Sequence, residues 1–369
     1  MTASERLDLV HRMGPDSGHE RARRRPDVPR GAVTAADGVL VVDKPQGLTS
    51  HDVVGATRRL AATRKVGHAG TLDPMATGLL LLGIGRATRF LTYLVGADKT
   101  YEATVRLGVE TTTEDADGEV VAARGCRPSD LPEGRLQEAF TTLTGPIQQV
   151  PSAVSAIKVD GVRAHQRVRD GQDVELQARP VTIHELRLTA EPRKAIVEAA
   201  LSDGPDVVEA VDIDILVSCS SGTYVRALAR DLGRALGCGA HLTALRRTAV
   251  GPFDIDEAHT LADLSAQVET DASSPEPHGV TTLPLEEVAR RCFEQLALTE
   301  GEARALRYGQ PLDAEVLERA EAPGGRRLQA SAKTAEQRVV AGFAPGGRLV
   351  ALLRHQGPRA RPVLVLDPA

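Results

Sequence analysis

A single carboxylate, Asp73, lies between a glycine-bearing turn and a run of leucines in residues 67–85, GHAGTLDPMATGLLLLGIG. His68 and Thr71 stand near it, and the stretch contains no second acid. A carboxylate in this setting can act as a nucleophile or as a base. The Asp-Pro pair is also a common helix start, with Asp as the N-cap and Pro at the first helical position. Spacing alone leaves both interpretations open.

A second candidate is Arg226, which lies near the beginning of a helix predicted over residues 224–236. The positive end of the helix dipole disfavours a cation there, so Arg226 is expected to face an anion. Arg230 follows four residues later and therefore lies on the same helix face. The anion is either a carboxylate from elsewhere in the chain or a phosphate. A solvated arginine is the alternative.

A third candidate is Tyr101, in the alternating segment TYEATVRLG, which predicts a half-buried strand. Tyr101 falls on the apolar face of that strand, where a core aromatic is the ordinary interpretation. Aromatic residues make up only 2% of the chain, however, and three of its four tyrosines lie in or near these segments. Their retention there indicates stacking on a ligand.

Four segments resemble, in order and in spacing, the motifs of the TruB family of pseudouridine synthases. They are VVDKPQGLTSHDVV, VGHAGTLDPMATGLLLLGIGRATR, DKTYEATVRLG and CSSGTYVRALARDLG. The likeness covers residues 37–260, and the C-terminal part resembles that family's small RNA-binding domain of the PUA type. A single Leu-Asp-Pro match would carry little weight, whereas four motifs in order are specific.

The resemblance implies an isomerase that converts uridine to pseudouridine at position 55, in the T-loop of tRNA. The C1′–N1 bond breaks, the detached uracil turns, and C5 bonds to C1′. No redox or group-transfer step occurs, so neither a cofactor nor a metal is expected. The base must be flipped out of the loop, which costs a few kcal/mol. A second activity, assistance in tRNA folding, is compatible with the same RNA contacts.

The resemblance also implies roles for the three candidates above. Asp73 matches the essential aspartate of the family, and Arg226 matches the arginine that pairs with it. That pair would keep the carboxylate ionised in a site that excludes water. Tyr101 matches the tyrosine that stacks on the target base, an interaction worth roughly 1–3 kcal/mol.

Five further residues are predicted to bind the substrate. Gly70 lets the backbone approach the RNA, and His68 and Thr71 line the approach. His68 matches a histidine that contacts the rearranged loop, although a turn histidine with a local hydrogen bond is the alternative. Leu245 matches a leucine of the base pocket, or is ordinary core. Lys44 belongs to the first motif and is expected to support the active-site loop.

Composition excludes several classes of protein. The 369 residues carry a net charge of −5, which argues against a globally basic nucleic-acid binder but not against a local basic groove. The four cysteines have no metal-binding spacing, and no apolar run approaches the ~20 residues that span a bilayer. The N-terminus has no secretory signal, so a cytoplasmic protein is predicted. Only six of the 45 basic residues are lysines, which is typical of a high-GC bacterial coding sequence.

The order of elements favours an α+β fold over a doubly wound sheet. The resemblance specifies it as the pseudouridine synthase fold, a mixed and largely antiparallel sheet flanked by helices, with a small β-rich domain after it. The predicted parts are a disordered leader (1–36), the catalytic domain (37–265), a linker or surface loop (266–282) and a PUA-like domain (283–369). Residues 150–180 resemble an RNA-clasping segment. The acidic segment TTTEDADGEVV is predicted to turn near Asp117, and it lacks the spacing of a calcium loop.

Two other functions use the same features. One is an RNA-folding protein without catalysis, and the other is a guide-RNA-dependent relative within a ribonucleoprotein. Binding alone does not need a carboxylate facing a polyanion, and the chain lacks long basic tails. The sequence therefore favours a stand-alone enzyme that acts as a monomer on the T-arm of tRNA, with no membrane or protein partner.

Overall fold

The computed structural model describes residues 26–132, 134–152, 158–159, 162–163, 176–201, 204–322 and 338–369. The strands of its main sheet are β1 (Gly38–Lys44), β2 (Val66–Ala69), β3 (Thr77–Ile84), β4 (Lys99–Leu107), β7 (Gly145–Gln149), β10 (Arg179–Leu188), β11 (Arg193–Leu201), β12 (Gly204–Cys219), β13 (Ala240–Val250), β14 (Phe253–Asp254) and β15 (Leu283–Pro284). The α-helices are α2 (Ser50–Leu60), α3 (Ala87–Leu94), α4 (Arg135–Leu143), α6 (Val225–Leu236), α7 (Leu261–Ala272), α8 (Leu285–Cys292) and α9 (Glu300–Arg307).

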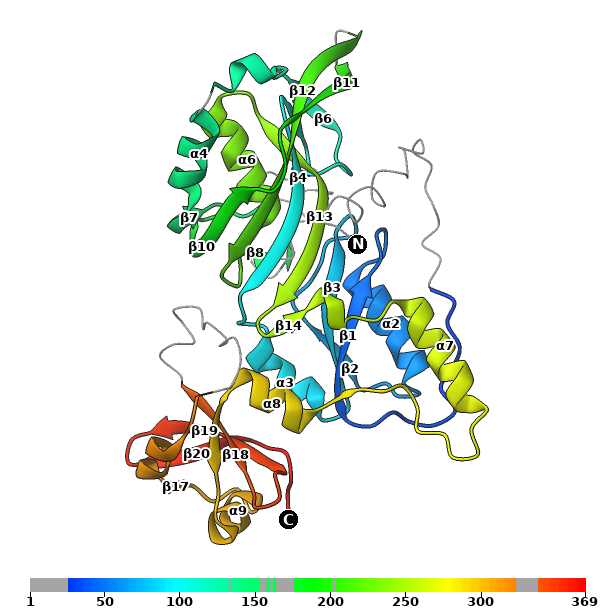
Figure 1. The fold of residues 1–369 in the computed structure, drawn as a ribbon, viewed down its shortest axis with the longest axis vertical. Helices are drawn as coiled ribbons and strands as arrows, with labels where there is room; N and C mark the ends of the chain where they lie inside the picture. Colours follow the sequence, from blue (N-terminus) through cyan, green and yellow to red (C-terminus); the bar gives the residue numbers. More distant parts are fainter. Residues whose placement is uncertain are drawn as a thin grey trace.

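The main sheet has 11 strands and runs through the upper and middle parts of the molecule (Figure 1). Its central path is β15–β1–β3–β13–β4–β12–β10–β7, with β2 beside β3, β14 beside β13 and β11 beside β12. Only the β13–β3 pair is parallel; the other pairs are antiparallel. The prediction of a mixed, largely antiparallel sheet with flanking helices is confirmed. Within the described residues no helix is long and apolar enough to cross a membrane.

The four leucines after the Asp73 segment form the middle of β3, a strand that is buried on both faces. Leu79 and Leu81 pack with α3 and α8 on one side, whereas Leu80 and Leu82 pack with α2 and α7 on the other. A strand covered on both faces needs an unbroken apolar run rather than an alternating one. This double burial anchors the loop that carries Asp73.

The other half of the sheet is covered by α6 and α4 (Figure 1). Leu228 and Leu232 of α6 and Phe140 of α4 pack on the apolar faces of β4, β12 and β13. Helix α6 is closed by Gly237, whose positive φ of 76° is favourable for glycine, so the helix ends at Leu236 as its predicted range does. The packing of Leu228 and Leu232 holds α6, with Arg226 near its start, against the sheet.

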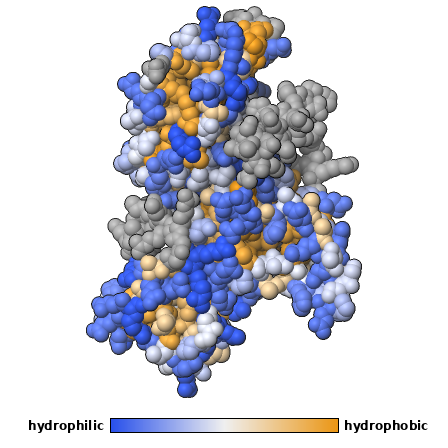
Figure 2. Space-filling view, viewed as in Figure 1, coloured by the Kyte–Doolittle hydropathy of each residue, from blue (hydrophilic) through white to orange (hydrophobic). Residues whose placement is uncertain are grey.

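A second sheet forms the C-terminal domain. Its strands, in the order β16–β18–β19–β20–β17, are β16 (Glu294–Ala297), β18 (Val339–Phe343), β19 (Leu349–Gln356), β20 (Arg359–Val365) and β17 (Leu312–Asp313). Helix α9 packs on this sheet through Ala303 and Leu306. The surface of this domain is largely hydrophilic, whereas exposed apolar side chains gather at the opposite end, where Ile196 and Val207 of the β11–β12 hairpin lie (Figure 2).

Three boundary predictions need correction. Residues 26–36 are not a disordered leader, because Val28 and Ala35 are buried against α2 and α7. The segment 266–282 is not wholly a linker, because α7 extends through it to Ala272. Residues 283–292 belong with the first domain, since β15 pairs with β1 and α8 packs under β3. Residues 1–25 and most of the predicted RNA-clasping segment lie outside the described residues.

Candidate active site

Asp73 lies in the loop between β2 and β3, and the helix-cap interpretation is wrong. The Asp73 carbonyl oxygen accepts a hydrogen bond from the Ala76 N–H at 3.1 Å, and the chain then enters β3. The carboxylate therefore caps no helix. It is 37% exposed, so one side of it faces solvent.

The segment between β1 and α2 holds the Asp73 loop in place through two hydrogen bonds. Ser50 is an N-cap residue by type, but the N-cap of α2 is Thr49, which forms a capping box with Asp52. Ser50 is buried instead, and its hydroxyl oxygen accepts from the Leu72 N–H at 2.9 Å. On the other side of Asp73, the Pro74 carbonyl oxygen accepts from the Gly47 N–H at 2.8 Å. Both flanks of the carboxylate are thus fixed to one segment.

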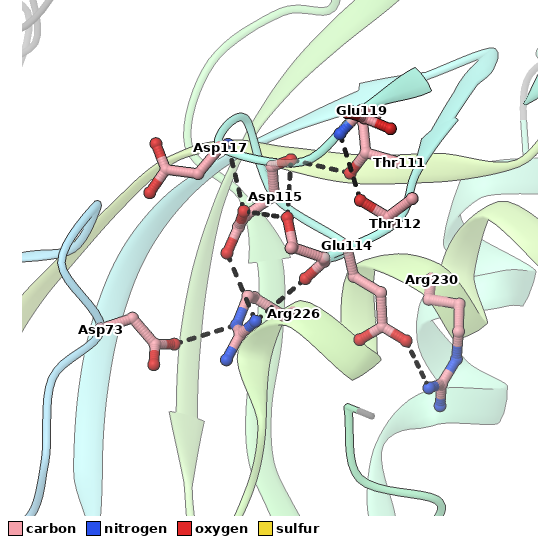
Figure 3. A network of polar contacts seen from close by, with 10 residues as sticks. Asp73, Thr111, Thr112, Glu114, Asp115, Asp117, Glu119, Arg226 and Arg230 are labelled. Atoms are coloured by element: carbon pink, nitrogen blue, oxygen red, sulfur yellow. Dashed lines mark hydrogen bonds and ion pairs between the residues drawn. The ribbon is translucent and has the colours of Figure 1, made fainter. Parts of the chain in front are cut away.

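Arg226 pairs with Asp73, and this contact is the centre of the site. Arg226 Nε lies 2.9 Å from Asp73 Oδ2, and the arginine side chain is 5% exposed (Figure 3). Arg226 Nη1 also lies 3.4 Å from Asp115 Oδ2 and donates to the Thr113 carbonyl oxygen at 2.9 Å. The anion that the helix dipole demanded is therefore a carboxylate, and there are two of them.

The acidic segment TTTEDADGEVV, which lacks the spacing of a calcium loop, supplies carboxylate partners for Arg226 and Arg230. Asp115 meets Arg226, and Glu114 Oε1 meets Arg230 Nη1 at 2.7 Å, so both arginines of the shared helix face are paired (Figure 3). Burial, followed by repulsion from Asp115, raises the pKa of the nearby Asp117 carboxyl. The turn's charge thus serves to hold the start of α6 rather than a cation.

A cleft of about 260 Å³ opens beside this ion pair. Six of the predicted site residues line it: Gly70, Thr71, Asp73, Tyr101, Arg226 and Leu245. Tyr101 is 8% exposed on β4, and burial raises the pKa of its hydroxyl. The cleft therefore offers an aromatic face, an aliphatic wall and one carboxylate fixed by an arginine. Such a site can hold a planar base and act on an atom next to it.

Of the residues predicted to bind the substrate, His68 and Lys44 do not line the cleft. The His68 ring packs edge-on against His51, with centroids 5.5 Å apart. Burial, and then the neighbouring His51, lower the pKa of His68. Lys44 is fully buried, and its ammonium donates to the carbonyl oxygens of Pro45, Leu48 and Pro74 at 3.0, 2.7 and 3.4 Å. Through Pro74 it contacts the Asp73 loop, and its buried ammonium has no surface for RNA.

Lys44 makes a prediction about stability. Burial lowers the pKa of its ammonium from 10.5 to about 8. Between these values the unfolded chain binds more protons than the folded chain, so the stability of the folded state rises with pH. Relative to Lys44→Met, the wild type should gain on the order of 1–2 kcal/mol in free energy of unfolding between pH 7.5 and 9.5. Urea denaturation of both proteins at the two pH values measures the difference, and a gap independent of pH would contradict it.

Two functional candidates escaped the sequence analysis, Lys99 and Arg247. Both are buried, at 6% and 1% exposure, and both line the cleft. A signal existed for each. Lys99 precedes Tyr101 by two residues and so shares its strand face. Arg247 lies in the segment LRRTAV, where an arginine among apolar residues is unusual for a buried strand.

Comparison with known proteins identifies the family. The family model described as "TruB family pseudouridylate synthase (N terminal domain)" matches residues 58–225. Two further models follow it, "tRNA pseudouridylate synthase B C-terminal domain" at residues 226–289 and "tRNA Pseudouridine synthase II, C terminal" at residues 293–367. The chain belongs to the TruB family. The last match begins where the structure places the start of the C-terminal domain.

Curated members of the TruB family cover nearly the whole chain. The tRNA pseudouridine synthase B of Arthrobacter sp. (strain FB24) is 50% identical over 333 residues, which are 90% of this chain and 97% of that protein. The protein of the same name from Paenarthrobacter aurescens (strain TC1) is 51% identical over 331 residues, which are 90% of this chain and 95% of that protein. The predicted family is therefore confirmed over the catalytic and C-terminal parts.

Solved structures confirm the predicted fold. A crystal structure of a Cbf5-Nop10-Gar1 complex contains a chain that is 25% identical, with a TM-score of 0.60. The match covers 95% of this chain and 92% of that one. The structure of an H/ACA RNP bound to a substrate RNA containing 2'-deoxyuridine matches at a TM-score of 0.59 and 25% identity, covering 90% of this chain and 85% of the other. The TruB-family chain described here thus has the pseudouridine synthase fold.

Proposed function

We propose that this chain isomerises uridine 55 in the T-loop of tRNA to pseudouridine. The observation that carries the proposal is the Asp73–Arg226 ion pair at 2.9 Å, set in the cleft that Tyr101 lines. The curated relatives at 50% and 51% identity are named tRNA pseudouridine synthase B, which agrees with a tRNA substrate.

In the proposed reaction the flipped uridine enters the cleft and stacks on Tyr101. Asp73 assists cleavage of the C1′–N1 bond, either as a nucleophile or as a base acting on the sugar. Arg226 holds the carboxylate at the sugar and keeps it from turning toward solvent. The uracil then rotates within the cleft, C5 bonds to C1′, the C5 proton leaves and N1 takes up a proton. Only atoms of one nucleotide are joined or separated, so one essential acid suffices.

The proposed enzyme acts on the T-arm without a guide RNA or a protein partner, as a monomer and in the cytoplasm where tRNA is found. Gly70 and Thr71, at the rim of the cleft, are proposed to contact the RNA backbone. His68 is proposed to contact the rearranged loop from outside the cleft, next to His51. The same contacts would assist tRNA folding.

Tritium release tests the proposal. The protein alone is incubated with an unmodified tRNA transcript or with a T-arm stem-loop, each made with [5-³H]uridine, since formation of pseudouridine expels the hydrogen from C5. One equivalent of tritium is expected per RNA, and none from an RNA with cytidine at position 55. Tight binding without release would favour an RNA-folding protein. Release only after addition of a guide RNA would favour the ribonucleoprotein alternative.

A further inference from the structure

Two buried cations in the cleft have no part in the reaction described above. Lys99 and Arg247 both line the cleft, yet neither forms an ion pair with a carboxylate among the residues that the structure describes. Arg226, by contrast, faces two carboxylates. A buried charge is costly unless it is paired and hydrogen-bonded. Two such cations on one cleft therefore suggest an anion that arrives with the substrate.

The two cations are held rigidly by backbone oxygens. Arg247 Nε donates to the Leu79 carbonyl oxygen at 2.7 Å, and Nη2 donates to the Gly70 carbonyl oxygen at 3.2 Å. Lys99 Nζ donates to the carbonyl oxygens of Val95, at 2.7 Å, and Ala97. These bonds leave further N–H groups on each cation, because an ammonium has three donors and a guanidinium five.

Both cations lie beside Tyr101. Arg247 on β13 is the direct cross-strand partner of Tyr101 on β4, and Lys99 lies two residues earlier on the same face of β4. They also converge beneath the Asp73 loop. A Cβ added to Gly70 would lie 3.5 Å from Arg247 Nη1 and 3.7 Å from Lys99 Cε. Gly70, with a φ of 84°, thus lets the loop approach both charges.

The proposed reaction produces an anion at this place. When the C1′–N1 bond breaks, its electron pair leaves with N1 and is delocalised over N1, O2 and O4 of the uracil. We infer that Arg247 and Lys99 bind these oxygens and stabilise the detached uracil anion. The charge disappears when C5 bonds to C1′, the C5 proton leaves and N1 is protonated. This inference rests on the proposed function and adds two catalytic residues to it.

The electrostatics of Lys99 support this role. Burial, and then repulsion from Arg247, lower the pKa of its ammonium to about 8. An anion bound between the two cations would offset that repulsion, and it would do so only after the C–N bond has begun to break. Such an interaction is stronger in the transition state than in the ground state, which is the condition for raising the rate.

The test is the dependence of the rate on the leaving base. Arg247→Met and Lys99→Met remove each charge at similar side-chain length. Single-turnover cleavage is measured as loss of the target nucleoside from nuclease digests of two T-arm RNAs, one with uridine and one with 5-fluorouridine at the target. Fluorine withdraws electrons, so 5-fluorouracil is the more stable anion and needs less help. The cleavage rate of each variant, relative to wild type, should fall about 100-fold on the uridine RNA but only about tenfold on the 5-fluorouridine RNA. The affinity of each variant for tRNA should stay within about threefold of the wild-type value.

Matched variants keep the result interpretable. Arg106→Met is the control: it removes an arginine of β4 that pairs with Asp212 outside the cleft, and it should keep the wild-type cleavage rate on each of the two RNAs. If the methionine variants fail to fold, Arg247→Lys and Lys99→Arg are used instead, because both keep the charge. Their cleavage rate on the uridine RNA should fall less than about tenfold. On the 5-fluorouridine RNA the fall in rate should be smaller still. An equal fold-loss of cleavage rate on the two RNAs in the Arg247 and Lys99 variants would overturn the inference. A loss of tRNA affinity with a weaker salt dependence would also overturn it and assign the cations to a phosphate. An inactive wild type would instead overturn the proposed function.

Discussion

Replacement of Asp73 by asparagine is expected to abolish pseudouridine formation, with a loss of ~10⁵-fold or more, the scale seen when an essential nucleophile is removed. The amide has the shape of the carboxylate and can still accept the hydrogen bond from Arg226 Nε, so the loop should keep its position. It cannot form a bond to the sugar or accept a proton from it. The rate of tritium release in a single turnover, at saturating enzyme, measures the effect.

Binding should behave differently from turnover in the same variant. A carboxylate that is 37% exposed repels the phosphates of any RNA that enters the proposed cleft. Removing its charge should therefore leave the affinity for tRNA unchanged or slightly higher, as measured by filter binding. Asp27→Asn, which changes an exposed carboxylate outside the cleft, is the control and should retain full activity. A loss of affinity as large as the loss of turnover would assign Asp73 to binding rather than to chemistry.

The site could be predicted from the sequence where a local rule constrained the residue. The helix dipole required an anion at Arg226, and strand alternation placed Tyr101 on a buried face; the structure bears out both. The partner of Arg226 could not be chosen between carboxylate and phosphate by such rules. That choice depends on a turn more than a hundred residues earlier in the chain, whose Asp115 reaches the arginine only after β4 and α6 have packed.

The errors have a common cause, which is burial that only the assembled fold reveals. The match to the first motif places Lys44 among the substrate-binding residues, yet three carbonyl oxygens enclose its ammonium. Ser50 is a good N-cap by type, but Thr49 takes that position and frees Ser50 to hold Leu72. Lys99 and Arg247 were missed for the same reason, because both are buried in the assembled sheet, where β4 and β13 pair.

The cationic side chains of the site fall into two groups, which differ in whether a carboxylate of the protein balances their charge. In one, Arg226 is balanced by Asp73 and Asp115, so its charge is largely compensated before the substrate arrives. In the other, Lys99 and Arg247 have no carboxylate partner among the described residues. Arg226 is therefore suited to orienting a carboxylate, whereas the second pair is suited to receiving new charge.

Replacement of Arg226 tests that division. Arg226→Lys keeps the positive charge but replaces a planar fork by a single ammonium, which cannot hold Asp73, Asp115 and the Thr113 carbonyl in one geometry. Turnover should fall by about 10²–10³-fold, the usual loss for a displaced catalytic contact. Affinity for tRNA should change little, because Arg226 is 5% exposed and its donors are already engaged by the protein.

Arg226→Met separates orientation from folding. This variant leaves the buried Asp115 without its arginine, and breaking a buried pair in this way costs about 3–5 kcal/mol of stability. The double variant Arg226→Met with Asp115→Asn removes that unpaired charge. It should recover part of the stability in thermal unfolding but none of the turnover, since Asp73 still lacks its partner. Recovery of turnover together with stability would mean that Arg226 only maintains the fold, and that Asp73 reaches the sugar without being oriented by it.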